Sequence, residues 1–330
     1  MIARLEVLSP EGLGEVEAGA DLAALIVDLL GDGPAALRDG DVVVVTSKIV
    51  SKAEGRVRTG DREEAIASET ARVVARRGAT QIVRNRLGLT MAAAGVDASN
   101  VEAGRIVLLP QDPDASARAL RAGLRTRTGR NVAVVVTDTS GRAWRHGQTD
   151  IAIGAAGLRV AEDFGGRVDP YGNPLAVTLT VVADEIASAA ELAQGKLTGR
   201  PVALVRGRAD LVLPATEDGA GAVSLVREEG ADLFGYGARE AVVRALAGHE
   251  ADRAPFGAPV EPHELLDALA RLVPGTPELT ESGGRRHLRV PPGVSRVALE
   301  AVLFAHGWEA VEVSDAGEDG MLAGVQPRCP

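Results

Sequence analysis

The sequence predicts a mixed α/β or α+β protein, with a larger N-terminal domain built on mixed sheets and a small C-terminal α/β module. Three observations support this prediction. Short apolar runs and amphipathic helical segments follow one another without a regular βαβ repeat. Residues 249–262 are rich in Pro, Gly and Ala and lack periodicity, as expected of a linker. The 330 residues also exceed the usual size of one hydrophobic core, so we expect domains at 1–248 and 263–330.

Apolar periodicity predicts the individual elements of both domains. In the N-terminal domain the expected strands are 41–45, 105–109, 132–136, 174–183 and 201–206. The expected helices there are 61–77, 114–124, 184–194 and 238–247, and Gly78 is expected to cap the first of them. In the C-terminal module we expect helices at 263–272 and 294–306 and strands at 286–290 and 309–313.

Composition narrows the class of protein. The net charge is −10, which argues against a nucleic-acid partner because phosphate backbones need a basic face. No run approaches the roughly 18 apolar residues of a membrane span, and the N-terminus lacks the apolar core of a signal peptide. Cys329 is the only cysteine, so neither a disulfide framework nor a cysteine metal cluster can form. We therefore expect a cytoplasmic protein without a membrane partner.

The stretch TDTSGRAWRHGQTDIAIG at 137–154 is the most informative part of the chain. Asp138 and two hydroxyl residues follow a predicted buried strand, a pattern that suits a site for a metal and a phosphate. Arg142 and Arg145 could bind a further anionic group. A solvated polar loop is the alternative. His146 has no second histidine near it in sequence, which argues against a zinc site or a catalytic triad.

No standard phosphate-binding loop is present, because the sequence contains neither GxxxxGK[ST] nor GxGxxG after a strand. The segment 47–55 is a candidate substitute, since its two lysines and two serines follow the predicted strand 41–45 and could hold phosphates. A solvated strand end explains the same residues. Asp97 and Asn100 lie in a turn-rich segment, where an Asx-turn or a helix cap is the alternative to a binding role.

Five motifs occur in order between about residues 5 and 246: SKIVSKAEG, AAAGVDASN, VTDTSGRAWRHGQTDIAIG, DPYGNPL and ADEIASAAEL. This set resembles the coenzyme F420-0:gamma-glutamyl ligase family. The resemblance implies a GTP-dependent enzyme with a non-standard nucleotide site that joins L-glutamate to F420-0 and releases GDP and phosphate. It also implies a homodimer, a divalent metal (Mg²⁺ or Mn²⁺) and K⁺ as an additional ion.

The same resemblance assigns roles to particular positions. Nucleotide contacts are implied for Leu13, Gly14, Glu15, Val16, Ser47, Lys52, Asn100, Gln194, Gly195 and Lys196. Metal ligands are implied for Asp97, Asp138 and Thr139. Apart from the resemblance, the charge of the phosphates leads us to expect Arg142 or Arg145, with Lys52, to neutralise it as catalytic residues. The segment beginning QGK departs from the family's usual MGK.

The tail beyond residue 248 matches none of the family's known layouts, being too short for a flavin-binding domain, and we assign it no role from sequence. Two other functions stay open: an inactive regulatory homologue that binds nucleotide or metal, and a metal-dependent phosphatase that uses the same carboxylates. Retention of Asp97, Asp138, Thr139 and Lys52 argues against the first of these.

Overall fold

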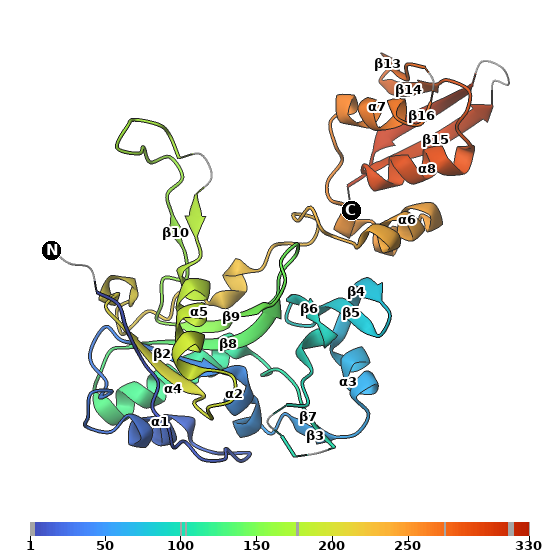
Figure 1. Cartoon of the computed structure of the whole chain (residues 1–330). Helices are drawn as coiled ribbons and strands as arrows, with labels where there is room; N and C mark the ends of the chain where they lie inside the picture. The colour runs from blue at the N-terminus through green and yellow to red at the C-terminus, as the bar shows by residue number, and fades with distance from the viewer. Residues whose placement is uncertain are drawn as a thin grey trace. The chain divides into compact units, whose positions relative to one another are not determined.

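The computed structural model describes residues 4–99, 101–102, 104–175, 178–273, 275–315 and 320–329. The chain divides into two compact units, each with its own core (Figure 1). The first unit contains Met1–Arg72 and Ile82–Val226, and the second contains Val73–Gln81 and Arg227–Pro330. Helices and several sheets are mixed along the chain, which confirms the predicted fold class.

A five-stranded mixed sheet forms the centre of the first unit. Its strands, in spatial order, are β1 (Glu6–Leu8), β12 (Val202–Arg206), β2 (Val42–Thr46), β8 (Ala133–Gly141) and β9 (Gln148–Ala156). The β2–β8 pair is parallel, with Val42 opposite Ala133 and Thr46 opposite Thr137. The other three pairs in this sheet are antiparallel.

The valines of β2 show why this sheet is covered on both faces. Val43 and Val45 belong to the core beneath α1 (Leu22–Leu30) and α4 (Pro113–Thr128). Val42 and Val44 belong to a second core beneath α5 (Val182–Gln194). Alternate side chains of a strand point to opposite faces, so an uninterrupted apolar run such as VVVV needs partners on both.

Smaller elements follow one another along the chain between β2 and α4. They are α2 (Ser47–Ala53), β3 (Val57–Thr59), α3 (Arg62–Glu69), β4 (Thr70–Arg77), β5 (Thr80–Asn85), β6 (Thr90–Ala92), the 3₁₀ turn η1 (Ala93–Gly95) and β7 (Arg105–Val107). Strands β3 and β7 pair with each other, and β4, β5 and β6 form a three-stranded sheet. Most of β4 belongs to the second compact unit. The first unit is completed by the short pair β10 (Glu162–Asp163) and β11 (Leu179–Thr180) and by the turns η2 (Ala209–Leu211) and η3 (Ala222–Leu225).

Two sequence predictions for this unit are wrong. The predicted helix 61–77 ends at Glu69, and β4 follows directly, paired with β5. The valine-containing run TARVVARR favours a strand once β5 offers it a partner, and Gly78 (φ 58°) forms the connecting turn rather than a helix cap. Residues 176 and 177 of the predicted strand 174–183 lie outside the described residues; in its described part, β11 is the strand and α5 begins at Val182.

The second unit is a four-stranded antiparallel sheet with helices on one face (Figure 1). The sheet order is β13 (Glu278–Ser282), β14 (Arg285–Val290), β16 (Met321–Pro327) and β15 (Trp308–Asp315). Helices α7 (Pro262–Ala270) and α8 (Arg296–Ala305) bury Leu265, Leu269, Leu299 and Leu303 against Leu288 and Trp308 of the sheet. The unit also contains α6 (Ala238–Ala247), η4 (Glu250–Asp252) and η5 (Ala254–Phe256).

The stretch 249–262, expected to be a linker, packs within this second unit. Asp252 is buried and accepts two hydrogen bonds from Arg244 Nη1, at 2.9 and 3.0 Å. The indole nitrogen of Trp308 donates to the carbonyl of Val260 at 3.0 Å. The second unit therefore contains Arg227–Pro330 together with Val73–Gln81, and the expected linker lies inside it.

None of the helices in the described ranges has the length and apolar character that crossing a membrane requires.

Separate cores predict separate unfolding of the two units. Leu288→Ala should destabilise the second unit by about 2–5 kcal/mol, because it leaves a cavity in a fully buried position. Hydrogen exchange followed by mass spectrometry should show faster exchange in β13–β16 and unchanged protection in β2 and β8. Leu322→Ala, at an exposed position of β16, is the matched control and should change neither. Equal loss of protection in both sheets would contradict this prediction.

Candidate active site

A small pocket lies where α2, the Gly95–Asp97 segment, β7 and β8 meet. Its lining residues come from segments that are far apart in the sequence. Some of them are polar and the others are apolar. The lining residues are Ser47, Lys48, Ser51, Gly95, Asp97, Val107, Leu108, Leu109 and Asp138. Three residues predicted from sequence, Ser47, Asp97 and Asp138, are thus brought together.

Parallel strand pairing explains why Ser47 and Asp138 meet. Thr46 is opposite Thr137 in the β2–β8 register, so the residues that follow them in the two segments lie side by side. Ser47 begins α2, while β8 continues through Asp138. The Ser47 hydroxyl donates a hydrogen bond to Asp138 Oδ1 at 3.1 Å.

Asp97 is held in the pocket by its backbone and by Lys48. Its backbone forms a β-bridge with Val107, with hydrogen bonds of 2.8 and 3.0 Å. Its carboxylate accepts from the backbone and hydroxyl of Ser99 and lies 2.7 Å from the ammonium of Lys48. Burial alone would raise the pKa of Asp97, but the hydrogen bonds from Lys48 and Ser99 outweigh it and hold the pKa below its usual range. This carboxylate is therefore ionised at neutral pH.

Asp138 has the opposite electrostatic character. Asp138 as a whole residue is half-buried, but the atoms packed around its carboxylate group shield that group from water. This burial raises the pKa of Asp138 to about 6, because hydrogen bonds from Ser47 and the Thr139 backbone offset it only in part. The neighbouring charge of Asp150 acts in the same direction as burial. The Asp138 carboxylate thus has too little positive charge around it, and a cation would supply it.

The donor set fits a hard divalent cation. Asp97 and Asp138 offer carboxylate oxygens in one pocket, which are the ligands that Mg²⁺ and Mn²⁺ prefer. Within the described ranges, no three His, Cys, Asp or Glu side chains cluster in a way that could hold an ion. A cation here would be held by two carboxylates, with hydroxyl, water and phosphate oxygens as the remaining ligands, and Mg²⁺ usually binds proteins in this way.

Thr139 lies on the other face of β8, because successive side chains of a strand alternate. Its hydroxyl donates to Asp150 Oδ1 at 2.8 Å and accepts from the ammonium of Lys196 at 2.7 Å. Lys196 also approaches Asp150 at 3.3 Å and Glu191 at 3.0 Å. Thr139 and Lys196 therefore belong to a second polar cluster beside α5, and Thr139 does not line the pocket of Asp97 and Asp138.

The segment 13–16 is anchored by its two apolar residues. Leu13 and Val16 are buried in the core shared with α2, whereas Glu15 is exposed. Glu15 Oε1 lies 2.5 Å from the ammonium of Lys52, the last basic residue of α2. Gly14 has a φ of 64°, a conformation that favours glycine. The predicted nucleotide contacts from these two segments are thus neighbours in space.

The remaining predicted residues lie apart from the pocket. Arg142 and Arg145 are exposed in the turn between β8 and β9, and their side chains make no hydrogen bond or ion pair with any described residue. Gln194 is buried at the end of α5, and Gly195 follows with a φ of 64°. Asn100 lies outside the described residues.

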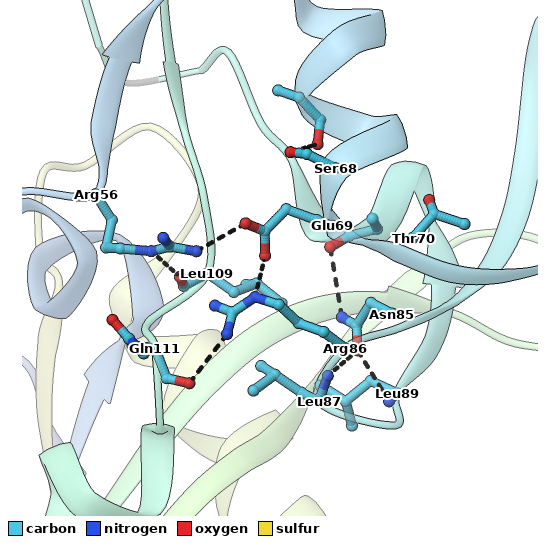
Figure 2. A network of polar contacts seen from close by, with 12 residues as sticks. Arg56, Ser68, Glu69, Thr70, Asn85, Arg86, Leu87, Leu89, Leu109 and Gln111 are labelled. Atoms are coloured by element: carbon cyan, nitrogen blue, oxygen red, sulfur yellow. Dashed lines mark hydrogen bonds and ion pairs between the residues drawn. The ribbon is translucent and has the colours of Figure 1, made fainter.

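A buried ion-pair network supports the apolar wall of the pocket (Figure 2). Glu69, at the end of α3, accepts from Arg56 Nη2 at 2.9 Å and also pairs with Arg86. Arg56 Nε donates to the carbonyl of Leu109 at 3.1 Å, and Arg86 reaches the carbonyl of Gln111 at 3.5 Å. The network joins the chain after α2, the end of α3 and the segment after β7, so it fixes Leu109 against the pocket.

The backbone just before Asp97 is strained. Ala93 and Ala94 both have positive φ values, 52° and 55°, which is unusual for residues with a Cβ. Gly95 follows at φ 79°, and a Cβ there would lie 2.6 Å from the Leu109 side chain. Close packing against the pocket wall therefore holds this turn in a sparsely populated conformation and sets where Asp97 emerges.

The chain is similar to known proteins over most of its first unit. The F420-0:gamma-glutamyl ligase family matches the chain over residues 12–77 and 60–207. Coenzyme F420:L-glutamate ligase of Archaeoglobus fulgidus is 40% identical over 226 residues, which is 62% of this chain and 88% of the relative. The enzyme of the same name from Methanothermobacter thermautotrophicus is 39% identical over 225 residues, 62% and 89% of the two chains. That from Halobacterium salinarum is 40% identical over 228 residues, 61% and 87%.

These matches show that the protein is a ligase. It belongs to the F420-0:gamma-glutamyl ligase family, which confirms the resemblance seen in the sequence motifs.

Sequence reasoning assigned Lys48 and Ser51 only a general phosphate-binding role within the segment 47–55, and it assigned Asp150 no role of its own. In the structure, Lys48 pairs with Asp97, Ser51 lines the pocket, and Asp150 binds Thr139 and Lys196. The segment 47–55 was expected at the end of a strand. Had it been recognised as a helix, the four-residue spacing of Ser47 and Ser51 would have placed both on one face.

The wall network predicts a stability change that depends on pH. Glu69→Gln should lower the free energy of unfolding at pH 7 by about 2 kcal/mol, because it removes the charge that pairs with Arg56 and Arg86. Burial opposes ionisation of Glu69, but these two arginines hold its pKa below the usual range. Its contribution is therefore full above the unfolded-state pKa of about 4.3 and disappears as the pH falls through the lower folded-state value.

Urea unfolding at several pH values measures this difference. Glu64→Gln, an exposed position of the same helix, is the control and should unfold like the wild type at every pH. Equal stability of wild type and Glu69→Gln at pH 7 would show that the network contributes nothing.

Proposed function

We propose that this protein joins L-glutamate to F420-0 in a GTP-dependent reaction and then extends the gamma-glutamyl tail. The observation that carries the proposal is the placement of Asp97 and Asp138 in one pocket of a chain that belongs to this ligase family. The curated relatives carry the name coenzyme F420:L-glutamate ligase, which supports the pair of substrates.

An amine cannot readily displace an oxygen of a carboxylate, because that oxygen is a poor leaving group. Amide formation therefore requires the carboxylate to be activated first. In the proposed reaction, a carboxylate oxygen of F420-0 attacks the gamma-phosphorus of GTP, the bond to the bridging oxygen breaks, and GDP leaves with its electron pair. The amino group of glutamate then attacks the acyl carbon of this acyl phosphate. The carbon–oxygen bond breaks, phosphate leaves, and the nitrogen loses a proton. Further rounds use the gamma-carboxylate of the added glutamate.

The residues near the pocket suit phosphoryl transfer, which asks a protein mainly for positioning and charge neutralisation. A divalent cation, Mg²⁺ or Mn²⁺, would neutralise charge on the transferring phosphoryl group when bound. Asp97 and Asp138 would hold it, and Ser47 would keep Asp138 oriented through its 3.1 Å hydrogen bond. Lys52 would bind nucleotide phosphate after exchanging its partner Glu15.

We propose that the second polar cluster contributes nucleotide contacts through the segment that begins QGK. Lys196 is half exposed beside Thr139 and could turn toward a phosphate oxygen. Arg142 and Arg145 are proposed to close over anionic substrate from the exposed β8–β9 turn. No side-chain nucleophile is needed in this scheme, because the substrate carboxylate is the first nucleophile and the glutamate amine is the second.

All the described site residues lie in the first unit. We therefore propose that residues 1–248 carry the ligase reaction, with a homodimer, a cytoplasmic location and K⁺ as an additional ion, as the sequence resemblance implies. Every proposed substrate is anionic, and local cations must reverse the charge of an acidic protein at the site.

One assay separates ligation from the two other functions left open by the sequence. The full-length protein is incubated with GTP, Mn²⁺, F420-0 and L-glutamate, and the products are analysed by mass spectrometry. A ligase gives F420 species heavier by one or more glutamyl residues, together with GDP. Phosphate release without a glutamylated product would indicate a phosphatase, and unchanged substrates would indicate a regulatory homologue.

Asp138→Asn should lower ligation by about 100-fold or more while leaving the fold intact. Loss of a charged ligand weakens the binding of a hard cation. Even mutation of a residue that only hydrogen-bonds to a metal ligand typically lowers metal affinity or activity by about 10–100-fold. Turnover is measured across a range of Mn²⁺ concentrations, with circular dichroism to confirm folding. Asp28→Asn, an exposed position on α1, is the matched control. Normal turnover of Asp138→Asn at low Mn²⁺ would refute the assignment.

Lys52→Ala should raise the KM for GTP more than the KM for glutamate. A charge-assisted contact to phosphate contributes about 2–3 kcal/mol, which corresponds to roughly 30–150-fold in KM. Steady-state kinetics with each substrate varied in turn measure the two constants. Arg58→Ala removes an exposed cation from the neighbouring strand β3 and should change neither. If only the KM for glutamate rises in Lys52→Ala, the residue belongs to a different subsite.

A further inference from the structure

Ser51 has a buried hydroxyl that the fold does not use. The residue is 1% exposed, and its Oγ has no hydrogen-bond partner among the described residues. A serine inside a helix usually donates to the carbonyl four residues earlier, here that of Ser47, but this bond is not formed. A buried hydroxyl without a partner costs free energy, so its retention needs a reason outside the helix itself.

The position of Ser51 supplies that reason. It lines the same pocket as Asp97 and Asp138. It is four residues after Ser47 on α2, so the two hydroxyls lie on one face of the helix. Ser47 already donates to Asp138 Oδ1, whereas the hydroxyl of Ser51 is left without a partner in the pocket.

We propose that the Ser51 hydroxyl oxygen is a ligand of the divalent cation held by the carboxylates of Asp97 and Asp138. The inference rests on the metal site of the proposed function and adds a ligand that sequence comparison did not assign. A neutral oxygen completes the coordination of a hard cation without adding a third negative charge, and serine hydroxyls serve this purpose at nucleotide sites.

Charge favours a cation over a phosphate oxygen as the partner of Ser51. Among the described lining residues are the acidic Asp97 and Asp138 but only one basic residue, Lys48, and that lysine is already paired with Asp97. A phosphate group beside Ser51 would meet two carboxylates. A divalent cation would be attracted by both carboxylates.

The proposal separates metal binding from folding. If Ser51 serves the cation, Ser51→Ala should keep or raise the melting temperature of the metal-free protein, because it removes an unpaired buried hydroxyl and places a better helix former in α2. The same variant should bind Mn²⁺ about tenfold more weakly than the wild type. A purely structural serine would give the opposite pattern, with a lower melting temperature and unchanged metal affinity.

The experiment uses the full-length protein without substrates. Mn²⁺ binding is measured by isothermal titration calorimetry and by the electron paramagnetic resonance signal of free Mn²⁺, and melting is measured in EDTA. Ser51→Cys replaces the hard hydroxyl with a soft thiol and should favour Cd²⁺ over Mg²⁺ relative to the wild type. Ser68→Ala is the control, since the exposed Ser68 donates its hydroxyl to the carbonyl of Ala65 at 2.8 Å, away from the pocket.

The outcomes distinguish this inference from the proposed function. Weaker Mn²⁺ binding in Ser51→Ala, a Cd²⁺ preference in Ser51→Cys and wild-type behaviour of Ser68→Ala would support it. Unchanged Mn²⁺ affinity in Ser51→Ala, with binding lost in Asp138→Asn, would overturn the role of Ser51 and leave the metal site of the proposed function in place. Loss of binding in Ser68→Ala to the same extent would overturn it as well.

Discussion

The parallel pairing of β2 with β8 is the constraint on which the rest of the candidate site depends. It places the two strand ends side by side, so that Ser47 and Asp138 become hydrogen-bonded neighbours although 91 positions separate them. Apolar side chains hold β2 in the middle of the sheet, because its alternate valines are buried in the cores on the two faces. The stability of the central sheet and the geometry of the pocket therefore have one cause.

The second carboxylate reaches the pocket by a different route. Asp97 follows a strained turn and is fixed by its bridge to Val107, while the ion pairs of Glu69 fix the wall against which the turn packs (Figure 2). The central sheet thus positions the carboxylate of Asp138, and the peripheral network positions that of Asp97. Such a division lets a rigid scaffold hold Asp138 while smaller elements set the position of Asp97.

The electrostatics of the pocket follow from these two origins. Lys48 forms an ion pair with Asp97 and offsets the burial of Asp138 only in part, and the hydroxyl of Ser51 has no partner within the described protein. Each of these features costs stability in the folded protein. Their occurrence in one pocket is the pattern expected where a bound ion, rather than the fold, supplies the missing interactions.

Sequence alone determined the elements whose periodicity is local. The valine runs, the helix 238–247 and the motifs that define the family were all found, because each depends on residues close together in the chain. Tertiary structure decided what periodicity cannot encode. Strand β4 replaced the end of a predicted helix because β5 pairs with it, and Asp138 and Thr139 separated because a strand sends successive side chains to opposite faces. Lys48 and Ser51 joined the site through contacts with distant segments, which no local pattern contains.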